Sequence, residues 1–187
     1  MSRTDLSNYS NSWYPPTIGA PAWKRLLWYF TSWVFFESTW FPVMAPKIAL
    51  LKAFGAKIGE GVVIKPRVQI KYPWLLEIGK YSWIGEGVWI DNLCRVRIGA
   101  NACLSQGAYL LTGNHNYSKP AFDLMVAPIT LEDGVWIGAK AIVCPGITCF
   151  SHSVLTAGSV ATRHLEAYTI YQGNPATGIK KRTIAEC

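Results

Sequence analysis

Apolar residues recur every six positions along most of this chain. Beyond Gly55 the period runs through fifteen hexapeptides and is interrupted at three places. A period of six matches neither the alternation of a strand nor the 3.6-residue repeat of a helix. It predicts an all-β solenoid with one short strand per hexapeptide and three strands per triangular coil, which makes about five coils. The recurring positions are Ile58, Ile64, Ile70, Ile78, Ile84, Ile90, Ile98, Leu104, Leu110, Leu131, Ile137, Val143, Cys149, Leu155 and Ala161.

A small or β-branched residue stands four positions after most members of this series. We expect the first series to point into the coil and the second to fit near its corners. Stacked coils would then pair their strands in parallel and bury continuous apolar ladders, although no single unit buries a core alone. The second series is Val62, Val68, Ser82, Val88, Ala102, Ala108, Val135, Ala141, Ile147, Ser153 and Ser159.

All three departures from the period follow a third hexapeptide. They lie at 71–74, at 91–93 and in a long loop at 115–128. If each coil has three sides, these insertions emerge at the same vertex of successive coils and lie beside one another. Insertions gathered on one face of a repeat scaffold commonly carry its binding groups.

The long loop contains His115, one of three histidines in the chain. His152 and His164 fall within regular hexapeptides, whereas His115 stands where a coil opens into the insertion. A lone histidine is more often a solvated side chain than a base, but an imidazole also titrates near neutral pH. Its position therefore makes His115 the candidate for chemistry.

The segment before the repeats is rich in aromatic residues, above all at 23–36. Glu37 interrupts it before the roughly 20 apolar residues that a membrane-spanning helix needs. Two interpretations remain. The segment is a helix packed against protein, or residues 23–41 make peripheral contact with a membrane, with Lys24 and Arg25 at the lipid headgroups.

A second short helix is expected at 47–54, with Gly55 as its C-cap. The chain is then organised as an N-terminal extension at 1–57 with one or two helices, a β-helix at 58–166 and a C-terminal segment at 167–187. At 187 residues, these parts are expected to form one domain.

Composition narrows the function classes only a little. The net charge is +7, from 18 basic and 11 acidic residues, and the basic residues are dispersed, so a nucleic-acid partner is not expected. Five cysteines without a C-x-x-C pair favour neither a disulfide framework nor a zinc site. The first residues lack the features of a secretory signal. We therefore expect a cytoplasmic protein, placed at the inner face of the membrane if the aromatic segment meets lipid.

Several motifs, in their order and spacing, resemble the hexapeptide-repeat acyltransferases, whose fold is a left-handed parallel β-helix. The resemblance covers about three-quarters of the chain. The motifs are the hexapeptides themselves, Thr-Gly-Asn-His at 112–115, Trp-Ile-Gly-Ala at 136–139, Pro-Gly-Ile-Thr at 145–148, Ala-Gly-Ser-Val at 157–160 and Gly-Asn-Pro-Ala at 173–176. Within that superfamily, Lys-Tyr-Pro-Trp at 71–74, Ile-Asp-Asn-Leu at 90–93 and Leu-Ser-Gln-Gly-Ala at 104–108 are most similar to the colanic acid biosynthesis acetyltransferases.

The resemblance implies an O-acetyltransferase that moves an acetyl group from acetyl-CoA to a sugar hydroxyl during exopolysaccharide or other surface-glycan biosynthesis. It places the catalytic base at His115. An imidazole with a pKa of about 6.5 can take the proton of the attacking hydroxyl. The resemblance also implies a homotrimer with active sites between subunits and a glycan or nucleotide-sugar acceptor.

The resemblance further implies the positions that contact CoA. Basic side chains near the C-terminus suit the CoA phosphates, although a solvated basic tail is the alternative for each of them. The implied CoA-binding residues are Ala139, Ala157, Thr162, Arg163, Lys180, Lys181 and Arg182.

The acceptor site is less defined. Polar residues at the insertion vertex are candidates to bind sugar hydroxyls and aromatic ones to stack on a pyranose, but each could equally serve the structure alone. These candidates are Tyr72, Trp74, Glu86, Asp91, Asn92 and Trp136. The chain departs from the galactoside and maltose acetyltransferases around Lys71 and Gly85, so their substrate is not transferred.

The alternative function is a non-catalytic β-helix or a zinc-dependent, carbonic-anhydrase-like one. A zinc site of that kind needs three suitably placed histidines. His115 is alone at its vertex, with His152 on another side, and we therefore expect no metal.

Overall fold

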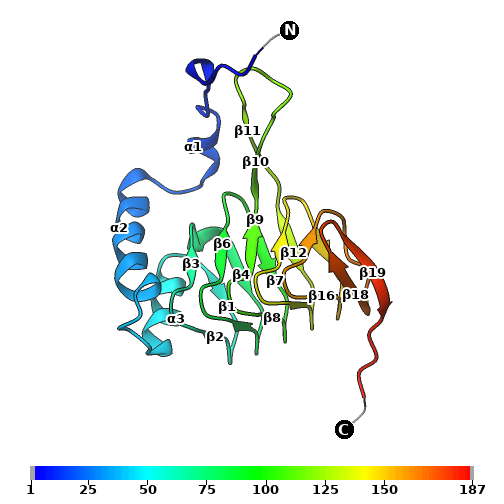
Figure 1. Ribbon diagram of the computed structural model, residues 1–187. Helices are drawn as coiled ribbons and strands as arrows, with labels where there is room; N and C mark the ends of the chain where they lie inside the picture. Colours follow the sequence, from blue (N-terminus) through cyan, green and yellow to red (C-terminus); the bar gives the residue numbers. More distant parts are fainter. Residues whose placement is uncertain (1–2, 186–187) are drawn as a thin grey trace.

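Three parallel sheets form the sides of a triangular prism, and each coil contributes one short strand to each side (Figure 1). The computed structural model describes residues 3–185. Side A contains β1 (Lys57–Ile58), β4 (Leu76–Ile78), β7 (Val96–Ile98), β12 (Ile129–Leu131) and β15 (Thr148–Cys149).

The other two sides repeat this arrangement. Side B contains β2 (Val63–Ile64), β5 (Trp83–Ile84), β8 (Cys103–Leu104), β13 (Trp136–Ile137), β16 (Val154–Leu155), β18 (Thr169–Gly173) and β19 (Ala176–Lys181). Side C contains β3 (Gln69–Ile70), β6 (Trp89–Asp91), β9 (Tyr109–Leu111), β14 (Ile142–Val143) and β17 (Val160–Ala161).

The core is the pair of apolar series that the period predicts. Every member of both series is buried, and parallel pairing places equivalent members above one another, such as Ile84, Leu104 and Ile137 on side B. Side-chain ladders of this kind exclude water along the whole prism, which is why units of six residues suffice. The predicted solenoid and its inward positions are confirmed.

The number of turns is about six, whereas the sequence predicted five. A sixth turn begins at Leu165, which bridges to Cys149 on side A, and continues in β18, which pairs with β16. This turn lacks the hexapeptide repeat, so the period did not reveal it. Residues 169–181, expected as a tail, therefore extend side B, with β19 returning antiparallel to β18.

The helices lie at the N-terminal end of the prism. They are η1 (Leu6–Asn8), α1 (Tyr14–Thr17), α2 (Ala22–Ser32), the π-helical η2 (Trp33–Glu37), α3 (Met44–Ala53) and, within the first insertion, η3 (Pro73–Leu75). The expected helix at 47–54 is α3, whose C-cap is Phe54, and Gly55 follows with a φ of +103°, the left-handed conformation that commonly ends a helix. None of the helices among residues 3–185 is long and apolar enough to cross a membrane.

One face of α2 packs on side C (Figure 1). Trp28 is 2% exposed, donates its indole N–H to the Ile70 carbonyl at 2.8 Å, and meets the rings of Phe36 and Phe54 at 5.2 and 5.0 Å. Elsewhere α2 and the start of η2 carry large apolar side chains that are more than half exposed: Trp23, Leu26, Leu27, Tyr29, Phe30 and Trp33.

The basic residues of α2 do not lie as the membrane interpretation expected. The Lys24 ammonium sits over the Trp74 ring, 4.9 Å from its centroid, and the Arg25 Nε atom is buried. Both charges are thus turned toward the protein rather than toward a headgroup layer beside the exposed face.

Candidate active site

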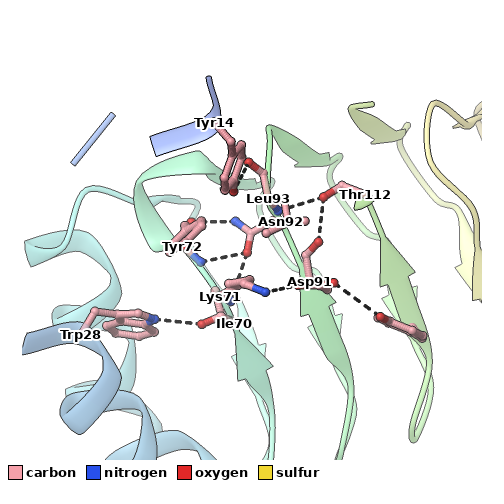
Figure 2. Close-up of polar contacts among 10 residues, drawn as sticks. Tyr14, Trp28, Ile70, Lys71, Tyr72, Asp91, Asn92, Leu93 and Thr112 are labelled. Carbon is pink, nitrogen blue, oxygen red and sulfur yellow. Dashed lines mark hydrogen bonds and ion pairs between the residues drawn. The ribbon is translucent and has the colours of Figure 1, made fainter. Parts of the chain in front are cut away.

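The three insertions lie stacked at the vertex between sides C and A, as the spacing predicted. Asn92, fully buried, joins the first two (Figure 2). Its side-chain carbonyl accepts the backbone N–H groups of Lys71 and Tyr72 at 3.1 and 3.0 Å, and its NH₂ donates to the Tyr72 carbonyl at 2.6 Å. The Asn92 amide thus uses both its carbonyl and its NH₂ group to hold the backbone of the first insertion in place.

Thr112 joins the second insertion to the long loop in the same way. Its hydroxyl donates to the Asp91 carbonyl at 2.7 Å and accepts the Leu93 N–H at 2.8 Å (Figure 2). The Tyr14 hydroxyl donates to the Leu93 carbonyl at 2.8 Å, and burial raises the pKa of Tyr14. The N-terminal segment is thereby attached to the vertex as well.

Asp91 is the ionisable group at the centre of this vertex. Its side chain is 11% exposed, and one carboxylate oxygen lies 3.1 Å from the Lys71 ammonium. The other accepts a long, 3.5 Å hydrogen bond from the Tyr109 hydroxyl. Burial, with the Asp91 charge as a further cause, raises the pKa of Tyr109 to about 12. Asp91 is thus a buried carboxylate held in place but not saturated with hydrogen bonds.

His115 lies on the hairpin of β10 (Gly113–His115) and β11 (Leu124–Val126), which projects from the same vertex (Figure 1). Its Nδ1 atom is 2.8 Å from the Phe122 carbonyl. A carbonyl only accepts, so in the neutral ring Nδ1 carries the hydrogen and Nε2 keeps its lone pair. The Phe122 ring lies parallel to the imidazole at 4.6 Å, and Tyr9 flanks it at 5.9 Å.

The imidazole is therefore half-buried and fixed in orientation, and its neutral form has the tautomer that leaves the Nε2 lone pair free. A general base must first be held in the right position to accept a proton, and this arrangement of the ring meets that requirement. His115 thus stays the candidate for the base.

The other candidates for the acceptor are not all brought to this vertex. Trp74 stacks on Tyr72 at 5.2 Å and donates its indole N–H to the Ile18 carbonyl, so it packs under the N-terminal helices. Glu86 lies at the vertex between sides B and C, 3.8 Å from Arg67. Trp136 lies on side B and donates to the Ser105 hydroxyl at 2.9 Å. Within one chain, neither Glu86 nor Trp136 is near the hairpin vertex.

The predicted CoA positions are also divided. Ala139 and Ala157 stack at the vertex between sides B and C, where Gly158 donates its N–H to the Ala139 carbonyl. Thr162 and Arg163 follow β17 at the vertex between sides C and A, and both are exposed. One chain therefore does not gather these four positions into a single groove.

The basic residues on β19 differ from one another. Lys180 is exposed, whereas Lys181 donates to the Thr169 hydroxyl at 2.9 Å. Arg182 follows the strand and donates to the carbonyls of Gly134 and His152 at 2.9 and 3.1 Å. Arg182 thus ties the end of β19 to the coils, which leaves less of its guanidinium for a phosphate.

No group of three His, Cys, Asp or Glu side chains able to hold a metal ion occurs among residues 3–185. His164 Nδ1 accepts the Thr148 N–H, and His152 packs against Tyr168. The zinc alternative gains no support from these contacts.

A groove beside the vertex brings in residues that the sequence did not single out. It has a volume of about 520 Å³ and lies between α2 and side C. Lys71 and Asp91 line it from the coils, and Arg25 and Glu37 line it from the helical segment. Trp89 also lines it. An outward Trp two positions before Asp91 was a readable signal, but nothing in the sequence placed α2 across that side.

No family model matches the chain. A protein named as a colanic acid biosynthesis acetyltransferase, WcaF of Escherichia coli (strain K12), is 39% identical over 137 residues, which are 73% of this chain and 75% of WcaF. The galactoside O-acetyltransferase of the same organism is 28% identical over 136 residues, 71% of this chain and 67% of that protein.

Solved structures agree with these relatives. A hexapeptide-repeat acetyltransferase from Vibrio cholerae superposes with a TM-score of 0.79 at 20% identity and covers 96% of this chain and 98% of its own. A galactoside acetyltransferase in complex with coenzyme A gives a TM-score of 0.75 at 25% identity, covering 86% and 81%. The solenoid is thus the left-handed parallel β-helix of these proteins.

Proposed function

Because the chain belongs to the hexapeptide-repeat acyltransferases, and is therefore an acetyl-CoA-dependent acyltransferase, we propose that it acetylates a sugar hydroxyl during exopolysaccharide or other surface-glycan biosynthesis. One observation carries the proposal. His115 stands at the opened coil with Nδ1–H bound to the Phe122 carbonyl and Nε2 free to act as a base.

The reaction follows from that geometry. Nε2 of His115 takes the proton of the sugar hydroxyl while its oxygen attacks the thioester carbonyl of acetyl-CoA. The tetrahedral intermediate then collapses, the C–S bond breaks, and the imidazolium returns the proton to the departing CoA sulfur. General-base help of this kind contributes about 10²–10⁴-fold. Backbone N–H groups at the opened coil are the proposed donors to the oxyanion.

The donor site is proposed to lie between subunits of a homotrimer. The CoA positions are split between two vertices of one chain, and the face of one subunit placed against the hairpin vertex of another would reunite them. The outward positions differ accordingly: side A carries Lys57, Glu77 and Arg97, whereas side B carries Trp83 and Trp136. Apolar faces of this kind favour burial in an assembly.

The proposed trimer is tested by the molar mass of the purified chain in analytical ultracentrifugation. Three copies are expected. A monomer that still turns over acetyl-CoA at full rate would contradict the shared site.

The catalytic proposal is tested with purified chain, acetyl-CoA and a panel of sugars, nucleotide sugars and lipid-linked glycans. The readouts are release of free CoA and the added acetyl mass on the acceptor. His115→Ala should lower turnover by about 10²–10⁴-fold while CoA binding is kept. His152→Ala, a histidine on another vertex, is the matched control and should keep the parental rate. A His115→Ala rate within about twofold of the parent would overturn the assignment.

Peripheral membrane contact through residues 23–41 stays a prediction. The exposed aromatic face of α2 suits an interface, because Trp and Tyr favour the headgroup region. Co-sedimentation of the full chain with anionic vesicles should be lost on Phe30→Ser and Trp33→Ser together. Equal pelleting of parent and variant would contradict the contact.

A further inference from the structure

The groove between α2 and side C is built from two parts of the chain that are far apart in sequence. Arg25, Tyr29 and Glu37 come from the helical segment, and Lys71, Trp89 and Asp91 come from the first two coils. Its volume of about 520 Å³ suits a ligand of the size of one or two sugar rings. It opens beside the vertex from which the His115 hairpin projects, because Asp91 contacts Thr112 through its own carbonyl (Figure 2).

Arg25 is the unusual group in this groove. Its Nε atom is buried and has no hydrogen-bond partner among residues 3–185, and no carboxylate of those residues lies within 4.0 Å of its guanidinium. Glu37, which also lines the groove, instead accepts the Ser32 hydroxyl at 3.0 Å. A buried donor without an acceptor is costly, and a guanidinium is matched best by the two oxygens of a carboxylate or phosphate. The Arg25 guanidinium therefore has no anionic partner in the groove, and a bound ligand with a carboxylate or phosphate would provide one.

The part of the lining that comes from the first two coils suits hydroxyl groups. Lys71 and Asp91 neutralise each other at 3.1 Å, and the second Asp91 oxygen accepts only the long, 3.5 Å hydrogen bond from Tyr109, so the pair can still accept from and donate to a neutral polar ligand. Trp89 is 42% exposed and lies parallel to Tyr109 at 4.6 Å, which fixes its ring as a flat apolar surface. One face of a pyranose carries mainly C–H groups and packs well on such a ring.

We propose that this groove binds the acceptor, and that the acceptor is a sugar carrying an anionic group. Arg25 binds the carboxylate or phosphate, Trp89 supports the ring, and the Lys71–Asp91 pair binds hydroxyls beside the catalytic vertex. This inference rests on the proposed function and adds to it the charge of the substrate.

Binding is measured by isothermal titration calorimetry on the full chain without acetyl-CoA. The probes are a sugar 1-phosphate, the corresponding uronic acid, the neutral parent sugar and inorganic phosphate. At least one anionic sugar should bind about tenfold or more tightly than the neutral sugar, as a charge-assisted pair allows. Comparison of the phosphate and the uronate shows which anion the groove prefers. Equal affinity for the anionic and neutral sugars would overturn the proposal.

Arg25→Gln should remove the preference for the anionic sugar and leave CoA binding unchanged, with Arg25→Lys keeping part of it. The control is Arg67→Gln, an exposed arginine at the vertex between sides B and C, which should behave like the parent. Melting temperatures exclude unfolding, and Trp89→Leu provides a second variant that weakens all sugars without changing the preference. A retained preference in Arg25→Gln would contradict the role of Arg25.

The two proposals fail in different ways. If anionic sugars bind but no acetyl group is transferred, the catalytic proposal falls and the groove stands. If acetyl transfer depends on His115 but shows no preference for anionic acceptors, the groove proposal falls and the catalytic one stands. His115→Ala should bind the anionic sugar as tightly as the parent in either case.

Discussion

The coils and the N-terminal helical segment are both rich in large apolar side chains, but they use them differently. In the coils, each inward position of the six-residue period is buried, from Ile58 to Ala161. In the helical segment, Trp28 is 2% exposed whereas Trp33, five residues later, is 64% exposed. Apolar composition is therefore a reliable guide to burial only where a repeat also determines the neighbours.

The polar contacts of the two regions differ as well. In the coils, the side chains of Asn92 and Thr112 form hydrogen bonds with the backbone of the neighbouring insertions. In the helical segment, Lys47 is fully buried with its ammonium unpaired among the described residues, and Arg25 has an unpaired Nε. Among the described residues, the coils also contain buried oxygens without a hydrogen bond, at Asp91 and Ser153, but the buried nitrogens without one, at Arg25 and Lys47, belong to the helical segment.

The largest expected effect is on the coil ladder. Leu104→Ala should lower the free energy of unfolding by about 2–5 kcal/mol, because Leu104 is fully buried between Ile84 and Ile137 and a cavity would remain. Chemical denaturation measures it. Leu27→Ala on the exposed face of α2 should change stability by less than about 0.5 kcal/mol. A larger loss for Leu27→Ala would show that a second copy covers that face in solution.

A smaller loss is expected at the insertion vertex. Asn92→Ala should cost about 1–3 kcal/mol, since it leaves the backbone of Lys71 and Tyr72 without three hydrogen bonds. Gln106→Ala, at an exposed position of another vertex, is the control in the same denaturation experiment. Equal stability of the two variants would mean that water replaces Asn92 without cost.

Lys47 should give a gain rather than a loss. Burial lowers the pKa of Lys47 because its ammonium is desolvated, so Lys47→Met should raise the free energy of unfolding by about 1–2 kcal/mol at pH 7. The unfolded chain binds more protons than the folded one between the lowered pKa and about 10.4, so parental stability rises with pH there and the gain shrinks toward pH 10. Exposed Lys52 supplies the control, Lys52→Met. A gain that does not vary with pH would contradict this cause.

The smallest effect concerns the joint between the two regions. Trp28→Phe should cost about 1 kcal/mol, because the Ile70 carbonyl loses its indole donor while most of the apolar contact is kept. Trp40→Phe, at an exposed position, should be neutral in thermal unfolding. If the two variants had the same melting temperature, the hydrogen bond would not contribute to the packing of α2 on side C.

Several features of the site could be read in advance for one reason. In a solenoid, the spacing of residues along the sequence determines which coil and which vertex they occupy. The stacking of 71–74, 91–93 and the His115 loop could therefore be predicted by counting hexapeptides. The sixth turn was not predicted from the sequence, because it is formed by backbone pairing of β18 with β16 rather than by side chains that repeat every six residues. The tautomer of His115 could not be predicted, because it depends on the Phe122 carbonyl, which lies across a hairpin. The register of that hairpin does not follow from the six-residue period.

The sequence by itself determined the prism, its inward ladders and the vertex where the three insertions stack, because a six-residue period leaves one way to bury its apolar positions. Only the tertiary structure decided where α2 lies, which of its residues meet side C, and that Arg25 and Asp91 share one groove. The physical reason is that a lone amphipathic helix specifies that one face is buried but not against what. A repeat specifies both the face and the neighbour.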